Sequence, residues 1–301
     1  MTTTRPHDLA GLPAASPRIR RILAPNPSPL THQGTNSYII GSGRVAVIDP
    51  GPDDPRHLAA LLAALDKGER VDAILVTHPH LDHSALAPRL AATTGAPVHA
   101  YGSATEGRTP LMERLAQAGL ESGGDGLDLG FRPDRRMADN ARLSGPDWEL
   151  SALHTPGHLG SHLCLSAGAV LFSGDHVMGW SSSVVSPPDG DMGAYMASLD
   201  RLGAQDWGCF LPGHGDRIDD PATRITDLIR HRRRREAQIL DALAAGPADP
   251  ARLTALLYTD IPANLHPAAR RNVLAHLIDL YEKNQVTACD SIHPATAFQR
   301  I

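Results

Sequence analysis

Four short apolar runs in this sequence each end in a motif that contains histidine, aspartate or both. The motifs are THPHLDH (77–83), TPGH (155–158), SGD (173–175) and PGHG (212–215). Runs of this length predict buried strands. In sheets flanked by helices, the side chains that follow the strands collect at a shared crevice, where glycine allows close backbone approach. We therefore expect seven side chains to converge: His78, His80, Asp82, His83, His158, Asp175 and His214.

Imidazole and carboxylate groups in this number indicate a metal site. Neutral imidazole and carboxylate oxygen together suit Zn²⁺, Fe²⁺ or Mn²⁺. Seven such groups exceed what one tetrahedral ion can use, so the motifs predict two divalent metal ions, with Zn²⁺ favoured and Fe or Mn as alternatives. Three further histidines near strand ends, His99, His154 and His176, are expected to lie outside the site.

Composition limits the kind of protein that carries this site. A chain of 301 residues with 42% apolar residues can build one large domain and a small one. No interval reaches the roughly 18 consecutive apolar residues of a membrane span, so no membrane association is expected. The N-terminal stretch lacks an apolar signal region and carries Asp8, which favours a cytoplasmic location. The three cysteines lack metal-ligand spacing and predict reduced, mostly buried thiols.

Patterns between the motifs predict the remaining elements. Residues 36–49 read as a hairpin, and helical patterns cover residues 54–65, 84–95 and 192–204. Residues 102–147 are rich in glycine, arginine and aspartate, and they predict a surface insertion with one short helix at 110–119. Apolar side chains at helical spacing predict three more helices, which contain residues 225–243, 253–257 and 273–280, followed by short strands in 284–301.

The motif set resembles that of the metallo-β-lactamase-fold hydrolases over roughly residues 30–215. This resemblance implies an α/β fold, the αββα sandwich, with two metal ions at one edge. It also implies that His78, His80 and His158 hold one ion, that Asp82, His83 and His214 hold the other, and that Asp175 bridges both. Asp49 matches a family position that orients a ligand loop, although an aspartate ending a strand before a Pro-Gly turn explains it equally well.

A closer resemblance is to the β-lactamase-like protein 2 group, carried by QGTNSYIIG, HTPGH, LFSGDHVMGW, the helix HRRRREAQIL (231–240) and the segment 261–286. Members of this group append a winged-helix domain, and they include a metal-dependent endoribonuclease that acts on single strands. The implied organisation is a hydrolase domain at 1–220, a linking helix at 221–245 and a winged-helix domain at 246–301. Because every metal ligand precedes residue 215, we expect the metal site to assemble without residues 246–301.

The expected reaction is hydrolysis by a hydroxide shared between two ions, with Asp82 and Asp175 as catalytic residues. Two metal ions suit phosphodiesters and acyl esters alike, so substrate choice depends on the rim, where Trp180, Ser181 and Ser182 follow Asp175. The alternatives are a phosphodiesterase or endoribonuclease acting on single-stranded RNA, a thioesterase or small acyl-ester hydrolase of glyoxalase II type, and a non-catalytic metal-dependent binding module. An exported antibiotic-hydrolysing lactamase is disfavoured, and a homodimer is an open alternative.

Charge favours RNA only weakly. Residues 246–301 contain five basic and five acidic side chains, whereas a surface that follows phosphates has a positive excess. The run Arg232 to Arg235 is the single basic cluster, and it reads either as a phosphate contact or as a solvated helix face. The closer family resemblance therefore carries the endoribonuclease, which is the first expectation, and the acyl hydrolase follows it nearly evenly.

Overall fold

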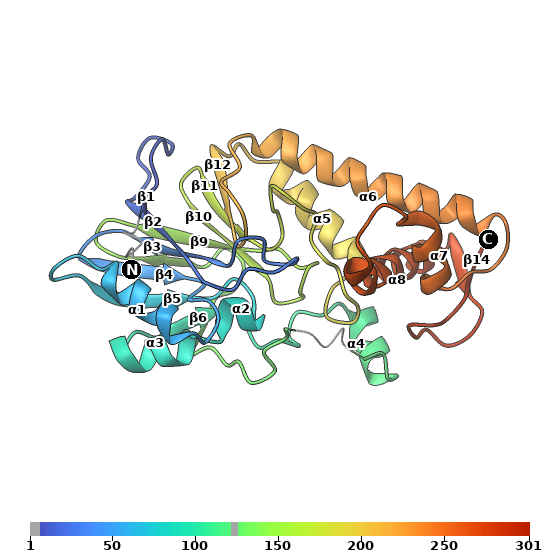
Figure 1. Cartoon of the computed structure of the whole chain (residues 1–301), viewed down its shortest axis with the longest axis horizontal. Helices are drawn as coiled ribbons and strands as arrows, with labels where there is room; N and C mark the ends of the chain where they lie inside the picture. The colour runs from blue at the N-terminus through green and yellow to red at the C-terminus, as the bar shows by residue number, and fades with distance from the viewer. Residues whose placement is uncertain (1–6, 122–125) are drawn as a thin grey trace.

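The computed structural model describes residues 7–121 and 126–301, and it places two β-sheets face to face with helices on both outer sides (Figure 1). The first sheet has the order β1 (His7–Asp8), β2 (Ile19–Leu23), β3 (Asn36–Ile40), β4 (Arg44–Ile48), β5 (Arg70–Leu75), β6 (Val98–Ala100) and β7 (Arg135–Arg136). The second has the order β12 (Cys209–Pro212), β11 (Val170–Gly174), β10 (Leu163–Ala167), β9 (Glu149–His154) and β8 (Arg142–Ser144). The expected αββα fold is confirmed.

Both faces of the central strands are buried, which explains why the sequence shows continuous apolar runs there. In β4, Ala46 and Ile48 pack between the sheets, while Val45 and Val47 pack against the outer helices α1 (Pro55–Ala63) and α3 (Ala87–Thr94). The outer face of the second sheet packs against α5 (Met192–Gly203) and α6 (Pro221–Leu243).

Strand direction brings the motif-bearing loops to one edge of the sandwich. Strands β4, β5 and β6 run parallel to one another, and β11 runs parallel to β12 with Gly174 paired to Pro212. Loops that leave the carboxyl ends of parallel strands project to the same side. The motifs that follow β5, β11 and β12 therefore start at neighbouring positions, as the sequence predicts.

The C-terminal module consists of α7 (Pro250–Leu257), the 3₁₀ turn η1 (Ala263–Leu265), α8 (His266–Glu282) and the antiparallel pair β13 (Val286–Ala288) and β14 (Phe298–Arg300). Helix α6 leads into it along the molecule (Figure 1). It begins at Pro221 and is capped by Asp220, whose carboxylate accepts from the backbone N–H of Thr223. The predicted helices and wing strands are confirmed. The boundaries at 220 and 245 stay predictions.

Several details differ from the sequence expectations. The helix expected at 84–95 begins only at Ala87 as α3, and Ser84 instead ends a separate short helix, α2 (Leu81–Ser84). The insertion at 102–147 supplies strands β7 and β8 as well as α4 (Pro110–Gln117), and α4 buries Leu111 and Leu115 against the C-terminal module. Residues 122–125 of this insertion and residues 1–6 of the N-terminal stretch lie outside the described residues. Cys164 and Cys209 are buried, but Cys289 is exposed.

Among the described residues, the longest helices carry too many polar side chains to form a bilayer-crossing span.

Candidate metal centre

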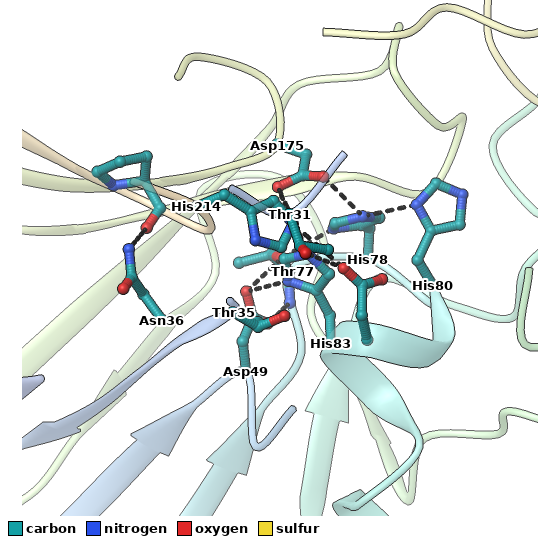
Figure 2. Close-up of polar contacts among 12 residues, drawn as sticks. Thr31, Thr35, Asn36, Asp49, Thr77, His78, His80, His83, Asp175 and His214 are labelled. Carbon is teal, nitrogen blue, oxygen red and sulfur yellow. Dashed lines mark hydrogen bonds and ion pairs between the residues drawn. The ribbon is translucent and has the colours of Figure 1, made fainter. Parts of the chain in front are cut away.

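The seven predicted ligands come together at the edge of the sandwich. The loop after β5 carries His78 and His80, and α2 turns Asp82 and His83 towards the same space. The side chains form three groups whose ligating atoms lie within 4.8 Å of one another: His78, His80 and His158; His78, His83 and Asp175; and Asp82, His83 and His214. Figure 2 shows Asp175 reaching into the space between His214, His83 and His78.

In the first group, three ring nitrogens face one another. His80 Nδ1 lies 2.9 Å from His78 Nε2 and 3.1 Å from His158 Nε2. His158 Nδ1 lies 2.6 Å from the carbonyl of Val184, which requires the proton on Nδ1 and leaves Nε2 as a lone pair. Lone pairs that converge in a buried space need a cation between them, so this donor set fits a metal ion.

In the second group, the outer nitrogen of each histidine is likewise held by an acceptor. His83 Nδ1 lies 2.9 Å from Asp49 Oδ2, and His214 Nδ1 lies 3.2 Å from the carbonyl of Gly34. These contacts turn both Nε2 atoms inward, 3.2 Å apart, and His214 Nε2 also lies 3.2 Å from Asp82 Oδ2. Two imidazoles and a carboxylate make a donor set suited to a divalent transition metal.

Asp175 presents one carboxylate oxygen to each group. Its Oδ1 lies 3.4 Å from Nε2 of both His83 and His214. Its Oδ2 lies 4.0 Å from His78 Nε2 and 3.8 Å from His158 Nε2. A carboxylate placed in this way can contribute one oxygen to each of two ions.

Gly213 shows why a glycine precedes the ligand His214 in the PGHG motif. A Cβ atom at residue 213 would lie 2.6 Å from both Asp175 Oδ1 and the His83 ring. Any side chain there would push apart two ligating groups that come from different sheets. The glycine therefore permits the close approach predicted from the sequence.

Burial and charge divide the histidines into two classes. Burial holds the pKa of His78 well below its usual range and lowers the pKa of His80 to about 3. Burial also opposes charge on His83 and His214, but the nearby carboxylates outweigh it and raise the pKa of His214 to about 9. The first group is therefore neutral at pH 7 in the metal-free protein, and the second carries protons.

Metal binding should release protons at pH 7, because only the neutral imidazole of His214 can ligate an ion. The raised pKa means that the proton stays bound in the metal-free protein until the pH approaches about 9. Metal affinity should therefore increase as the pH rises towards that value. Calorimetric titration in two buffers with different ionisation enthalpies measures the number of protons released, and equal heats in both buffers would contradict this expectation.

Asp49 contacts two parts of the ligand loop. Beyond its contact with His83, it accepts from the backbone N–H of Thr77 at 2.7 Å and from the Thr77 hydroxyl at 2.8 Å. The Thr77 hydroxyl in turn lies 3.0 Å from His78 Nδ1. Sequence reasoning missed Thr77, although its hydroxyl directly precedes the first histidine of the motif. Asp49 is thus connected to ligands of both groups.

The predicted rim residues differ in their surroundings. Trp180 is 38% exposed and stacks on His32 with ring centroids 4.9 Å apart. A Cβ at Gly215 would lie 2.5 Å from the Trp180 ring, so the indole borders the segment that carries His214. The carbonyl of Ser181 accepts from Arg224 at 2.6 Å, and the Ser181 hydroxyl bonds the carbonyl of Ser182 at 3.2 Å. Trp180 therefore borders the site, and these serine contacts stay within the loop and α6.

The three histidines expected to lie outside the site are not in any of the three ligand groups found among the described residues. His154 stacks on Tyr101 and contacts the carbonyl of Gly160 at 2.8 Å, and His176 is buried with its ring centroid 4.6 Å from that of Tyr195.

The run Arg232 to Arg235 is not one solvated face of α6. Arg232 is 2% exposed, and Arg235 donates to the carbonyl of Leu257 at 2.7 Å while lying over the ring of Tyr258. Arg233 and Arg234 are exposed. Only Arg233 and Arg234 fit the solvated helix face, because successive residues of a helix point in different directions and Arg232 and Arg235 face the protein.

Residues 30–214 match the metallo-beta-lactamase superfamily, and the chain belongs to this superfamily. Residues 250–292 match the beta-lactamase associated winged helix domain, which confirms the predicted nature of the C-terminal module. The hydrolase-type fold and the ligand groups thus occur together with an appended winged helix.

Named relatives are similar to this chain over most of its length. The beta-lactamase-like protein 2 homolog of Drosophila melanogaster is 32% identical over 282 residues, which cover 90% of each chain. An atrochrysone carboxyl ACP thioesterase of Aspergillus fumigatus is 31% identical over 280 residues, covering 86% of this chain and 79% of the relative. The crystal structure of a metallo-beta-lactamase family protein from Thermus thermophilus has a TM-score of 0.74 at 23% identity, covering 94% of this chain and 98% of that one, and shows the same fold.

Proposed function

We propose that this protein is a two-metal hydrolase of acyl thioesters or esters. The observation that carries the proposal is the placement of Asp175, one oxygen towards each of two ligand groups. In this proposal His78, His80 and His158 hold one ion, and Asp82, His83 and His214 hold the other. Asp49 positions the ligand loop through Thr77 and His83.

Two divalent ions, when bound, supply Lewis acidity and a water molecule of lowered pKa. Zn²⁺ is favoured on donor type, with Fe or Mn as alternatives. The protein itself fixes imidazole tautomers through Val184, Asp49 and Gly34. The Asp82 side chain is 27% exposed and that of Asp175 is 11% exposed, so Asp82 is the carboxylate that would be better placed to accept the proton of the attacking water and pass it to the leaving group.

The surroundings of the ligand groups favour an acyl substrate over RNA. Leu81, between two ligands in the chain, is 47% exposed, and Trp180 borders the segment that carries His214. Apolar groups that stay exposed beside a site indicate contact with an apolar part of a ligand. A relative at 31% identity is named as an ACP thioesterase. A phosphate contact by the whole basic run is disfavoured, because Arg232 is buried and Arg235 donates to the carbonyl of Leu257.

A substrate panel tests this assignment. We expect hydrolysis of acyl thioesters, with kcat/KM rising from acetyl to octanoyl because each buried methylene contributes about 0.8 kcal/mol. The panel also contains a single-stranded RNA oligomer and bis-p-nitrophenyl phosphate. RNA cleavage without thioester hydrolysis would move the assignment to phosphodiesterase, and binding of metal without turnover of any member would favour the non-catalytic module.

The protein should contain about two transition-metal ions per chain. Elemental analysis of protein purified without chelator, in medium supplied with zinc, iron and manganese, measures the content and identifies the metal. A content of at most one ion under these conditions would contradict the assignment of two ligand groups. A metal-free preparation titrated with Zn²⁺ gives the same count independently.

A cytoplasmic location and a homodimer stay predictions from the sequence. Sedimentation of the metal-loaded protein tests for the homodimer, because a dimer has twice the 32.0 kDa mass of the chain.

A further inference from the structure

Two proposed metal ligands contact the same short segment, residues 183–185, which we call the support segment. The hydroxyl of Ser183 donates to the backbone carbonyl of Asp175 and to that of His176. The carbonyl of Val184 accepts from His158 Nδ1 at 2.6 Å. The support segment therefore sets the position of Asp175 and the orientation of the His158 ring.

The other side of the support segment is held by helices α6 and α8. Arg232 on α6 donates to the carbonyl of Ser183, and Asn272 on α8 accepts from the backbone N–H of Val185 at 2.9 Å. Arg232 also lies 3.3 Å from Asn272 Oδ1, so the two side chains contact each other as well as the segment. Earlier in the same loop, Arg224 on α6 donates to the carbonyls of Met178 and Ser181.

Arg232 is an unusual group to bury here. It is 2% exposed, and among residues 7–121 and 126–301 it forms no ion pair with a carboxylate. Its guanidinium lies 5.0 Å from the ring of Tyr195, and the Tyr195 hydroxyl donates to the carbonyl of His176 at 3.0 Å. An unpaired buried charge is costly, whereas an apolar side chain would fill the same space without that cost. The planar guanidinium group of Arg232 carries several N–H donors, which suits it to hold backbone carbonyl groups in place.

We propose that Arg232 and Asn272 are positioning residues of the metal centre. They hold the support segment, and the support segment holds Asp175 and His158. The C-terminal module therefore helps to set the geometry of the ligand group formed by His78, His80 and His158. This inference rests on the ligand assignment made above, but it does not depend on which substrate is hydrolysed.

The test compares metal binding by Arg232→Met, Asn272→Ala and the parent. Metal-free protein is titrated with Co²⁺ against a chromophoric chelator, and the visible absorption of bound Co²⁺ reports ligand geometry. We expect each variant to weaken one of the two Co²⁺ sites by about 10- to 100-fold and to shift its absorption band, as loss of a ligand-orienting contact does. The matched control is Arg233→Met, which removes an exposed arginine from the next position of α6 and should match the parent.

Circular dichroism and thermal melting of the metal-free variants separate folding from positioning. A variant that melts near the parent and keeps both the parent affinity and the parent spectrum overturns the proposal. A variant that only melts earlier, with an unchanged spectrum in its folded fraction, also overturns it. If Arg232→Met does not fold, Asn272→Ala decides the question, because it removes one amide and leaves the guanidinium in place. Failure of the parent to bind two ions would instead contradict the ligand assignment.

Discussion

Replacing Asp175 by alanine is expected to abolish hydrolysis of any good substrate while the chain stays folded. Its two oxygens face different ligand groups, so the change removes a donor from both proposed ions at once. Loss of transition-state stabilisation of about 4 kcal/mol corresponds to a roughly 10³-fold lower kcat/KM. The measurement is kcat/KM on the best substrate of the panel, together with the metal content of the variant.

The control for this change is Asp216→Ala. Asp216 follows the PGHG motif, but its side chain is 80% exposed and pairs with Arg21 at 3.3 Å. Its removal should leave kcat/KM within a factor of about two, as expected of an exposed ion pair. Activity of Asp175→Ala at half the parent level would show that the carboxylate does not bridge two ions.

Deletion of residues 246–301 is expected to disrupt both folding and metal binding. The deletion uncovers apolar side chains that pack on the module: Leu111, Met112, Leu115, Ile239 and Leu243. Each loses burial worth about 1.5–3 kcal/mol, and their sum approaches the roughly 5–15 kcal/mol by which a domain is stable. Asn272 is lost as well, so the support segment loses its contact with α8. From the sequence we expect the metal site to assemble without residues 246–301, and these contacts lead us to the opposite expectation.

Solubility, melting temperature and metal content of a chain ending at residue 245 measure the effect. A chain with residues 246–301 present and Arg270→Ala, which changes an exposed side chain of α8, controls for changes at the surface of this helix. A soluble truncated protein with two ions and the parent Co²⁺ spectrum would restore the independent metal site and would contradict the proposed role of Asn272.

The ligand set was predictable because it depends on local pattern and strand direction. His78, Asp175 and His214 each follow a short apolar run, and parallel pairing brings the ends of such runs together. Helix α6 was predictable because apolar residues recur at helical spacing after a capping aspartate and a proline. These features need no knowledge of which distant segments touch.

The supports of the site could not be predicted in the same way. Arg232 reads as part of a solvated basic run, and only the packing of α6 against α5 and α8 shows that it is buried. Neither Ser183 nor Asn272 stands out by residue type or spacing. The carbonyl of Ser183 accepts from Arg232, 49 positions away, and Asn272 contacts a residue 87 positions away. Side-chain contacts of this kind depend on tertiary packing, which periodicity does not encode.

The two sheets contribute separate halves of the ligand set: the loop after β5 and the adjoining α2 carry four ligands, and loops of the second sheet carry His158, Asp175 and His214. His83 and His214 are separated by 131 positions in the chain, so no unfolded segment can present the whole set. An ion that binds only the folded chain stabilises it by about 2.7 kcal/mol at a free concentration one hundred times its dissociation constant. Metal supply would therefore govern how often the edge of the sandwich opens, and with it how long each molecule survives proteolysis in a metal-poor cell.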